Sequence, residues 1–209
     1  MIKISGLNKT ISGNTILNNI NLELEDGKVY GFIGRNGSGK TMLFRSICGL
    51  ITIDSGSIEI DGELISKNKV TQDVGLLLEN PSFLNELSGF DNLRSIAAIR
   101  NIVDDSRIYE ILEIVGLKDA QDKKYEQYSL GMKQRLAIAN VIMEYPKILI
   151  FDEPTNAIDE EGIDVLKKII IEEKDKGNTV LLASHEKEII DELCDQTFHM
   201  KNGVIDYIQ

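Results

Sequence analysis

A glycine-rich segment at positions 34–41 combines the residue types that bind phosphate in proteins. It reads Gly34-Arg35-Asn36-Gly37-Ser38-Gly39-Lys40-Thr41, follows an apolar run at 29–33 and leads into a helix-like run from Met42. Strand, glycine-rich turn and helix in this order are the context that a phosphate-binding loop requires. The glycines let backbone N–H groups converge on one point, and the helix adds the positive end of its dipole. This pattern therefore predicts that residues 34–42 bind a nucleoside triphosphate.

Lys40 and Thr41 supply the polar side chains of this site. A lysine here reaches the outer phosphates, and the threonine hydroxyl is a ligand for the Mg²⁺ that accompanies them. A surface turn that happens to precede a lysine is the alternative interpretation. It explains neither the apolar run before the segment nor the helix after it.

Two carboxylates come directly after another apolar run, at 148–151. They are Asp152 and Glu153. A carboxylate at the end of a buried strand is costly unless a cation lies beside it. We expect Asp152 to serve Mg²⁺, directly or through water, and Glu153 to hydrogen-bond an attacking water. A simple strand-end cap is the alternative, and the phosphate loop elsewhere in the chain disfavours it.

Two more apolar runs end in polar residues. The run at 179–183 ends in Ser184-His185, and the run at 74–78 ends in Glu79. In a parallel sheet the ligand lies beyond the carboxyl ends of the strands, so these side chains should meet the phosphate loop. His185 is then suited to donate to the γ-phosphate and to hold Glu153 in register. For the other histidine, His199, we expect only a structural role.

The spacing of apolar residues predicts an α/β fold. Alternation at 2–7 and 16–24, with a hairpin near 58–63, indicates an antiparallel lobe. Strands alternating with helices after the phosphate loop indicate a mostly parallel sheet core. Helices are expected at about 88–100, 105–115, 163–170 and 186–194, and a closing hairpin at 197–208. We expect one domain, 1–209, with a helical lobe at about 82–145.

Composition excludes several classes of protein. The formal net charge is −11, which argues against nucleic-acid binding because phosphate backbones recruit basic surfaces. No apolar run approaches the length of a membrane span, and the N-terminus lacks a signal-peptide pattern. Cys48 and Cys194 lie in apolar surroundings and are expected to be buried, reduced thiols. If the protein works on a membrane, another subunit must supply the membrane part.

A further helix is expected to begin behind Ser129, within Tyr128-Ser129-Leu130-Gly131-Met132-Lys133-Gln134-Arg135. Ser129 is a suitable N-cap, and a helix N-terminus binds anions. Nothing in this segment alone says which anion, so a simply capped helix remains the alternative.

With these motifs, the chain resembles the ATP-binding-cassette (ABC) ATPases over nearly its whole length, which implies a P-loop NTPase fold of ABC type. Residues 34–41 match the Walker A loop, and 148–153 match Walker B with its catalytic carboxylate. Residues 129–132 match the signature usually written LSGGQ, 156–159 match the D-loop, and His185 matches the switch histidine. Five motifs in the family's order make the resemblance highly specific.

The resemblance implies partners as well as residues. ABC ATPases bind ATP and Mg²⁺ and close as head-to-tail dimers, so Ser129 and Gly131 of one subunit would cap the γ-phosphate held at Lys40 of the other. The metal would be held by Thr41, Glu79 and Asp152, and catalysis would rest on Glu153 and His185. A separately encoded integral membrane permease is the implied partner, with no nucleic acid involved. The subunit would then be cytoplasmic and peripheral on the inner face of the membrane.

Three departures from the family pattern individualise the chain. Glu79 stands where the family has a glutamine, Leu130 and Met132 alter the signature, and Ile11 stands near the usual adenine-stacking aromatic. The first two resemble the bacterial lantibiotic- and bacitracin-type export or immunity transporters. Loss of the aromatic stack would weaken base binding by ~1–3 kcal/mol.

We therefore interpret the chain as the ATP-hydrolysing subunit of a bacterial ABC transporter that exports an antimicrobial peptide or similar compound. Phe83 and Leu84 are candidate contacts for its permease, unless they belong to the core of the helical lobe. A soluble ABC ATPase acting on a protein assembly, such as an iron–sulfur scaffold, shares the same motifs and remains the alternative.

Overall fold

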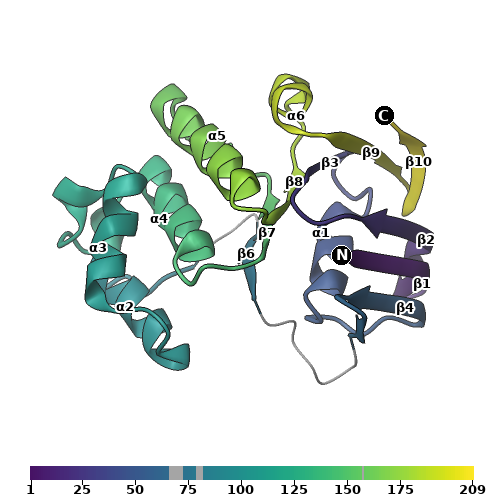
Figure 1. The fold of residues 1–209 in the computed structure, drawn as a ribbon, viewed down its shortest axis with the longest axis horizontal. Coiled ribbons are helices and arrows are strands. Elements are labelled where there is room, and N and C mark those ends of the chain that lie inside the picture. Colours follow the sequence, from purple (N-terminus) through teal and green to yellow (C-terminus); the bar gives the residue numbers. More distant parts are fainter. Residues whose placement is uncertain (66–72, 79–81, 157) are drawn as a thin grey trace.

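The computed structural model describes residues 1–65, 73–78, 82–156 and 158–209, and it contains two β-sheets with helices around them (Figure 1). The antiparallel sheet lies at one end, the lobe of α2, α3 and α4 at the other, and the larger sheet between them. No helix in these ranges is long and apolar enough to cross a membrane.

The larger sheet has the strand order β10-β9-β3-β8-β7-β6. All neighbouring strands in it run parallel except the β9–β10 hairpin. Its strands are β3 (Val29–Ile33), β6 (Val74–Leu77), β7 (Ile148–Asp152), β8 (Thr179–Ala183), β9 (Gln196–Lys201) and β10 (Val204–Ile208). Every residue of β7 and β8 is buried, as expected for a parallel strand covered on both faces.

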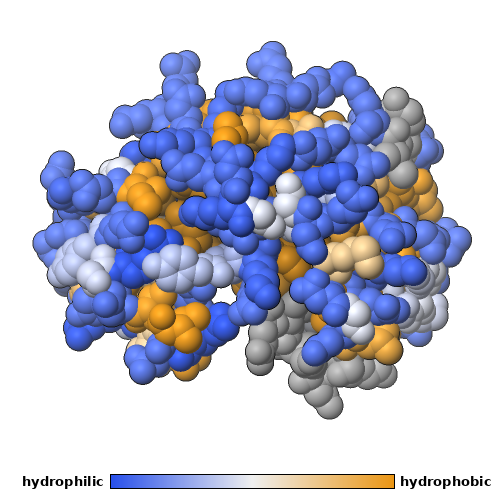
Figure 2. Space-filling view, viewed as in Figure 1, coloured by the Kyte–Doolittle hydropathy of each residue, from blue (hydrophilic) through white to orange (hydrophobic). Residues whose placement is uncertain are grey.

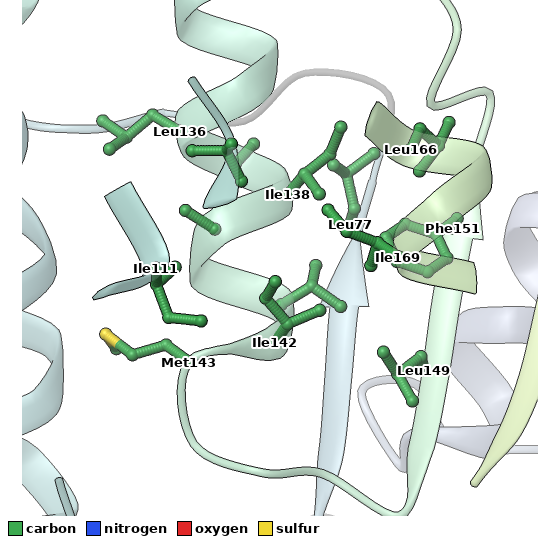
Figure 3. Packing of buried hydrophobic residues seen from close by; sticks show 14 of the residues in the cluster. Leu77, Ile111, Leu136, Ile138, Ile142, Met143, Leu149, Phe151, Leu166 and Ile169 are labelled. Carbon is green, nitrogen blue, oxygen red and sulfur yellow. The ribbon is translucent and has the colours of Figure 1, made fainter. Parts of the chain in front are cut away.

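Alternate residues of β7 enter two separate cores. Leu149 and Phe151 pack with α4 (Leu130–Ile142) and α5 (Glu160–Asp175), and Figure 3 shows both side chains facing these helices. Ile148 and Ile150 point to the other face and join the core that α1 (Lys40–Ile47) shares with the antiparallel sheet. An unbroken apolar run is therefore what a strand between two cores requires.

The antiparallel sheet has the order β2-β1-β4-β5. Its strands are β1 (Ile2–Ile11), β2 (Asn14–Leu24), β4 (Ser55–Ile60) and β5 (Glu63–Leu64). Inward-facing residues such as Ile4, Leu22 and Ile58 pack on the apolar side of α1, beside Phe44. This packing fixes the helix whose N-terminus follows the glycine-rich loop.

The helical lobe contains α2 (Gly89–Arg100), α3 (Asp105–Ile114) and α4, with 3₁₀ turns at Lys118–Ala120 and Tyr125–Gln127. Each of the three helices begins behind a side chain that accepts a hydrogen bond from a first-turn amide: Ser88, Asp104 and Ser129. On the face shown in Figure 2 most of the surface is hydrophilic, with apolar patches over this lobe. A sixth helix, α6 (Lys187–Leu193), lies beside the larger sheet.

The expected fold class is confirmed, and the differences lie at the ends of elements. β1 continues beyond residue 7 to Ile11, so the turn to β2 is only Ser12-Gly13. The helix expected at about 88–100 is α2, which begins at Gly89 because Ser88 caps it. His199 and Cys194 are partly buried, and Cys48 is buried.

The two cysteines yield a pH-dependent prediction. Both thiols are free, and burial raises the pKa of each to about 12. A raised pKa keeps the thiol protonated at pH 8, where an ordinary cysteine is partly thiolate. A thiol reagent should therefore label the native protein slowly at pH 8 and label both cysteines rapidly in denaturant. Rapid labelling of both thiols in the native protein would contradict the buried positions.

Candidate functional site

A pocket of about 320 Å³ lies where the glycine-rich loop meets the end of β7. It brings together most of the residues that the sequence singles out, although they are far apart in the chain. It is lined by Ile16, Arg35, Asn36, Gly37, Ser38, Gly39, Lys40, Thr41, Met42, Asp152 and Glu153. Gly34, the first residue of the loop, is not among the lining residues.

The loop presents backbone amides to this pocket. Gly37 and Gly39 have φ values of 80° and 111°, a backbone region that favours glycine. Gly39 is the N-cap of α1 and makes no side-chain cap, and the first turn of α1 holds no acidic residue. The first N–H groups of the helix therefore keep their capacity to bind an anion, with the helix dipole favouring negative charge.

Lys40 carries a positive charge into the protein, with only 6% of the residue exposed. Its Nζ donates to the carbonyl oxygen of Gly34 at 2.7 Å and lies 3.6 Å from Oε1 of Glu153. The ammonium thus sits between the loop and the acidic end of β7. From there it can move to a bound phosphate without leaving the pocket.

Thr41 and Asp152 place two oxygen atoms side by side. The hydroxyl of Thr41 donates to Oδ2 of Asp152 at 2.5 Å, and Asp152 is 1% exposed. Magnesium in nucleotide sites takes one or two such oxygens from the protein and the rest from phosphates and water. Within the described ranges no three His, Cys, Asp or Glu side chains cluster to hold a metal. The pair therefore fits a metal that arrives with its nucleotide. Glu79, the third expected ligand, lies outside the described residues.

Glu153 is held in an unusual conformation. Its φ is 52°, a left-handed backbone that costs a non-glycine residue about 1–3 kcal/mol. Its N–H donates to the carbonyl of Ala183 at 2.9 Å, and its side chain is buried. Among the described residues Oε1 accepts no hydrogen bond, and it lies 3.6 Å from Nζ of Lys40 at the pocket wall. That oxygen is available to accept a proton from a water molecule in the pocket.

His185 is brought to Glu153 because β7 and β8 are neighbours, with Asp152 paired to Ala183. The backbone N–H of His185 lies 3.2 Å from Oε2 of Glu153, and its Nδ1 lies 2.8 Å from the same oxygen. The side chain of His185 is 64% exposed, so its outer nitrogen faces solvent. The histidine can orient the carboxylate and still contact a ligand.

Ser129 and Gly131 are not part of this pocket. Ser129 is exposed and caps α4, accepting a hydrogen bond from the amide of Met132 at 3.2 Å, and Leu130 is 72% exposed. An exposed helix N-terminus that lies outside the pocket of its own chain is what a site completed by another subunit would need. Of the expected D-loop, Ala157 lies outside the described residues, and Asp159 caps α5.

Sequence reasoning missed two residues of the site. Ile16 forms an apolar wall of the pocket. Gln134 is buried, and its side-chain amide donates to the carbonyl of Pro154 at 3.1 Å, which ties α4 to the segment after Glu153. Gln134 shares a helical face with Ala137, Ile138 and Val141, which are all buried. A polar residue among apolar ones on one face of a helix indicates a buried polar contact, so the sequence could have pointed to Gln134.

The candidate permease contacts behave differently from one another. Phe83 packs edge-on against Tyr125, with 5.3 Å between the ring centroids. It belongs to the core of the helical lobe, which was the alternative to a permease contact. Leu84 is 60% exposed.

A second cavity, of about 980 Å³, lies between α2 and α3. The cationic side chains of Arg94 and Arg107 at its wall are ion-paired with Asp105 and Glu110, so this cavity does not resemble the nucleotide pocket.

The family assignment rests on residues 17–156, which match the model of the ABC transporter family. The chain belongs to this family. It is 44% identical over 204 residues to an uncharacterized ABC transporter ATP-binding protein, YybJ, of Bacillus subtilis, covering 97% of this chain and 94% of the relative. This chain is thus an ATPase subunit that binds and hydrolyses ATP.

Two relatives carry names with a substrate. The lantibiotic transport ATP-binding protein SrtF of Streptococcus pyogenes is 39% identical over 93% of this chain and 84% of its own length. The bacitracin transport ATP-binding protein BcrA of Bacillus licheniformis is 40% identical over 97% of this chain and 67% of its own. Nothing in these comparisons supports the iron–sulfur alternative.

Solved structures agree on the fold. A dimeric ATP-binding cassette in a post-hydrolysis state with ADP and Pi superposes with a TM-score of 0.90, at 22% identity, covering 100% of this chain and 98% of that one. The protein CbiO1 of Clostridium perfringens, part of an ABC transporter complex, gives 0.82 at 29% identity, covering 99% and 87%.

Proposed function

We propose that this ATPase energises a membrane permease that exports an antimicrobial peptide or a similar compound. The observation that carries the proposal is the pocket in which Lys40, Thr41, Asp152 and Glu153 meet. The export role rests on similarity to the lantibiotic and bacitracin transport proteins.

In this proposal the loop residues Gly34, Arg35, Asn36, Gly37, Ser38, Gly39, Lys40, Thr41 and Met42 hold the triphosphate. Lys40 exchanges its hydrogen bond to Gly34 for one to the outer phosphates, which keeps the buried ammonium paired. Ile16 packs on the nucleotide from the β2 side. Ile11 is 40% exposed at the end of β1, so no aromatic ring is supplied there for the base.

The metal proposal assigns Mg²⁺ to Thr41 and Asp152, with Glu79 as a further ligand. The support is the contact between the Thr41 hydroxyl and the buried Asp152 carboxylate. Mg²⁺ bound there would neutralise charge between this carboxylate and the phosphates. Without such a cation, phosphate oxygens would meet a buried carboxylate directly, an unfavourable contact.

Glu153 is proposed as the general base. Its Oε1 accepts a proton from the attacking water once Lys40 has turned to the phosphates, while Oε2 stays bound to His185. His185 keeps the carboxylate in place and donates from its exposed nitrogen to the γ-phosphate as charge develops there. The hydrogen bond from Glu153 to Ala183 maintains the backbone conformation that aims the carboxylate.

We further propose that Ser129 and Gly131 act on the nucleotide of a second copy. Both residues lie outside the pocket of their own chain, and Ser129 and Leu130 at the N-terminus of α4 are exposed. In a head-to-tail dimer this end would contact the γ-phosphate held at the partner's loop. ATP would then favour the closed dimer, and hydrolysis would release it.

The permease is proposed to bind the helical lobe, at about 82–145, with the exposed Leu84 as one contact. Residues 1–209 would form one ATPase domain on the inner face of the membrane, attached through this partner. No role for nucleic acid is proposed, since the formal net charge is −11.

The catalytic assignment predicts the behaviour of Glu153→Gln. The amide has nearly the same shape but accepts no proton, so ATP should bind while turnover falls by about 10²-fold or more. Phosphate release and equilibrium ATP binding measure the two effects. Glu172→Gln, an exposed glutamate on α5, is the matched control and should keep full activity. Hydrolysis at the wild-type rate in Glu153→Gln would refute the assignment.

The transport assignment predicts a membrane partner. Affinity purification of this chain from detergent-solubilised membranes of its native host should recover an integral membrane protein in stoichiometric amount. Recovery of a soluble complex alone would instead support an assembly ATPase and contradict the transport proposal.

A further inference from the structure

We propose that the turn between β9 and β10, centred on Asn202-Gly203, is a positioning element that holds the phosphate loop in its binding conformation. The N–H of Gly203 donates to the carbonyl of Ser38 in the loop at 2.9 Å. The carbonyl of Gly203 accepts from the N–H of Asn18 in β2 at 2.8 Å. One residue near the end of the described chain therefore connects the loop to the antiparallel sheet.

The loop is closely packed between β2 and β9 by backbone atoms. A Cβ on Gly203 would lie 2.4 Å from the carbonyl oxygen of Ile16, and one on Gly34 would lie 2.4 Å from that of Met200. A Cβ on Gly39 would lie 3.0 Å from the Ile16 oxygen. Because these neighbours are backbone rather than flexible side chains, they cannot move aside cheaply. The glycines permit an approach that side chains would prevent.

The hydrogen bond to Ser38 sets the direction of a phosphate-binding amide. The peptide bond between Ser38 and Gly39 is planar and trans, so its C=O and N–H point in opposite directions. Since Gly203 holds the carbonyl oxygen on the side of the turn, the Gly39 N–H is directed away from the turn. Gly39 lines the nucleotide pocket. Gly203 thus acts through Ser38 and touches no nucleotide.

On the side of the β9–β10 turn, the loop borders a cavity. It has a volume of about 560 Å³ and is lined by 33–38, 199–202 and Asp206. Arg35, Asn36 and Gly37 therefore border open space on this side, whereas Gly34 is packed against Met200. The backbone contacts from the β9–β10 turn are the means by which the sheet restrains the loop.

The chain contains a matched control for this turn. Asn202-Gly203 has φ values of 49° and 77°, and Asp61-Gly62, between β4 and β5, has 51° and 80°. Both are two-residue hairpin turns of the type that requires positive φ at both positions. A Cβ on Gly62 would meet nothing within 4 Å. Gly203→Ala and Gly62→Ala therefore impose the same backbone strain, but only the first disturbs the loop.

The inference rests on the proposed nucleotide site and is tested by equilibrium binding of MgATP to wild type, Gly203→Ala and Gly62→Ala. Gly62→Ala should bind as wild type does. Gly203→Ala should bind about tenfold more weakly or worse, with KM raised more than kcat is lowered. The melting temperature should fall in both variants, and further in Gly203→Ala, because only that alanine also meets the backbone of Ile16. Binding by Gly203→Ala within twofold of Gly62→Ala would overturn the inference, whereas absence of binding in all three proteins would overturn the nucleotide site itself.

Hydrogen exchange in the wild-type protein provides a second test that does not depend on a variant folding. Saturating ATP should slow exchange of the Gly203 and Asn18 amides, because ordering the loop strengthens both hydrogen bonds. The amides of the 61–64 turn should not change. Unchanged exchange at Gly203 in the ATP-bound protein would contradict a link between the turn and the loop.

Discussion

Three charged side chains buried at one edge of the sheet impose the constraint on which this structure depends. Lys40, Asp152 and Glu153 are all less than a tenth exposed, and together they carry one positive and two negative charges. Buried charges cost several kcal/mol each unless they are paired and hydrogen-bonded. The Lys40–Glu153 and Thr41–Asp152 contacts meet this need without ligand. A nucleotide brings more negative charge, which the proposed Mg²⁺ and a lysine turned to the phosphates would offset.

The rest of the fold holds these groups in place. β7 is buried on both faces, which fixes Asp152 at its end, and its pairing with β8 sets His185 beside Glu153. The backbone N–H of Glu153 is held by the carbonyl of Ala183, and its carboxylate is held by His185. On the other side, α1 begins at Lys40, and its apolar face packs on the antiparallel sheet. Each core therefore positions one half of the pocket.

Local signals predicted most of this arrangement. Apolar runs that end in Asp152 and His185 revealed buried strands, and the glycines of 34–41 revealed the loop. Contacts between distant segments were not predictable, because nothing near Gly203 in sequence indicates that its N–H meets Ser38. The pocket wall at Ile16 was missed for the same reason. Glu79 was readable from the sequence, yet its position lies outside the described residues.

We propose that Ser129 of a second copy completes each nucleotide site, and mixing two inactive variants tests this most directly. Lys40→Ala and Ser129→Glu should each hydrolyse almost no ATP alone. If the dimer is head-to-tail, half of the dimers in an equal mixture hold one intact site of two, so activity should return to about a quarter of wild type. Activity no greater than the sum of the separate variants would show that Lys40 and Ser129 act within one chain, and would contradict the shared site.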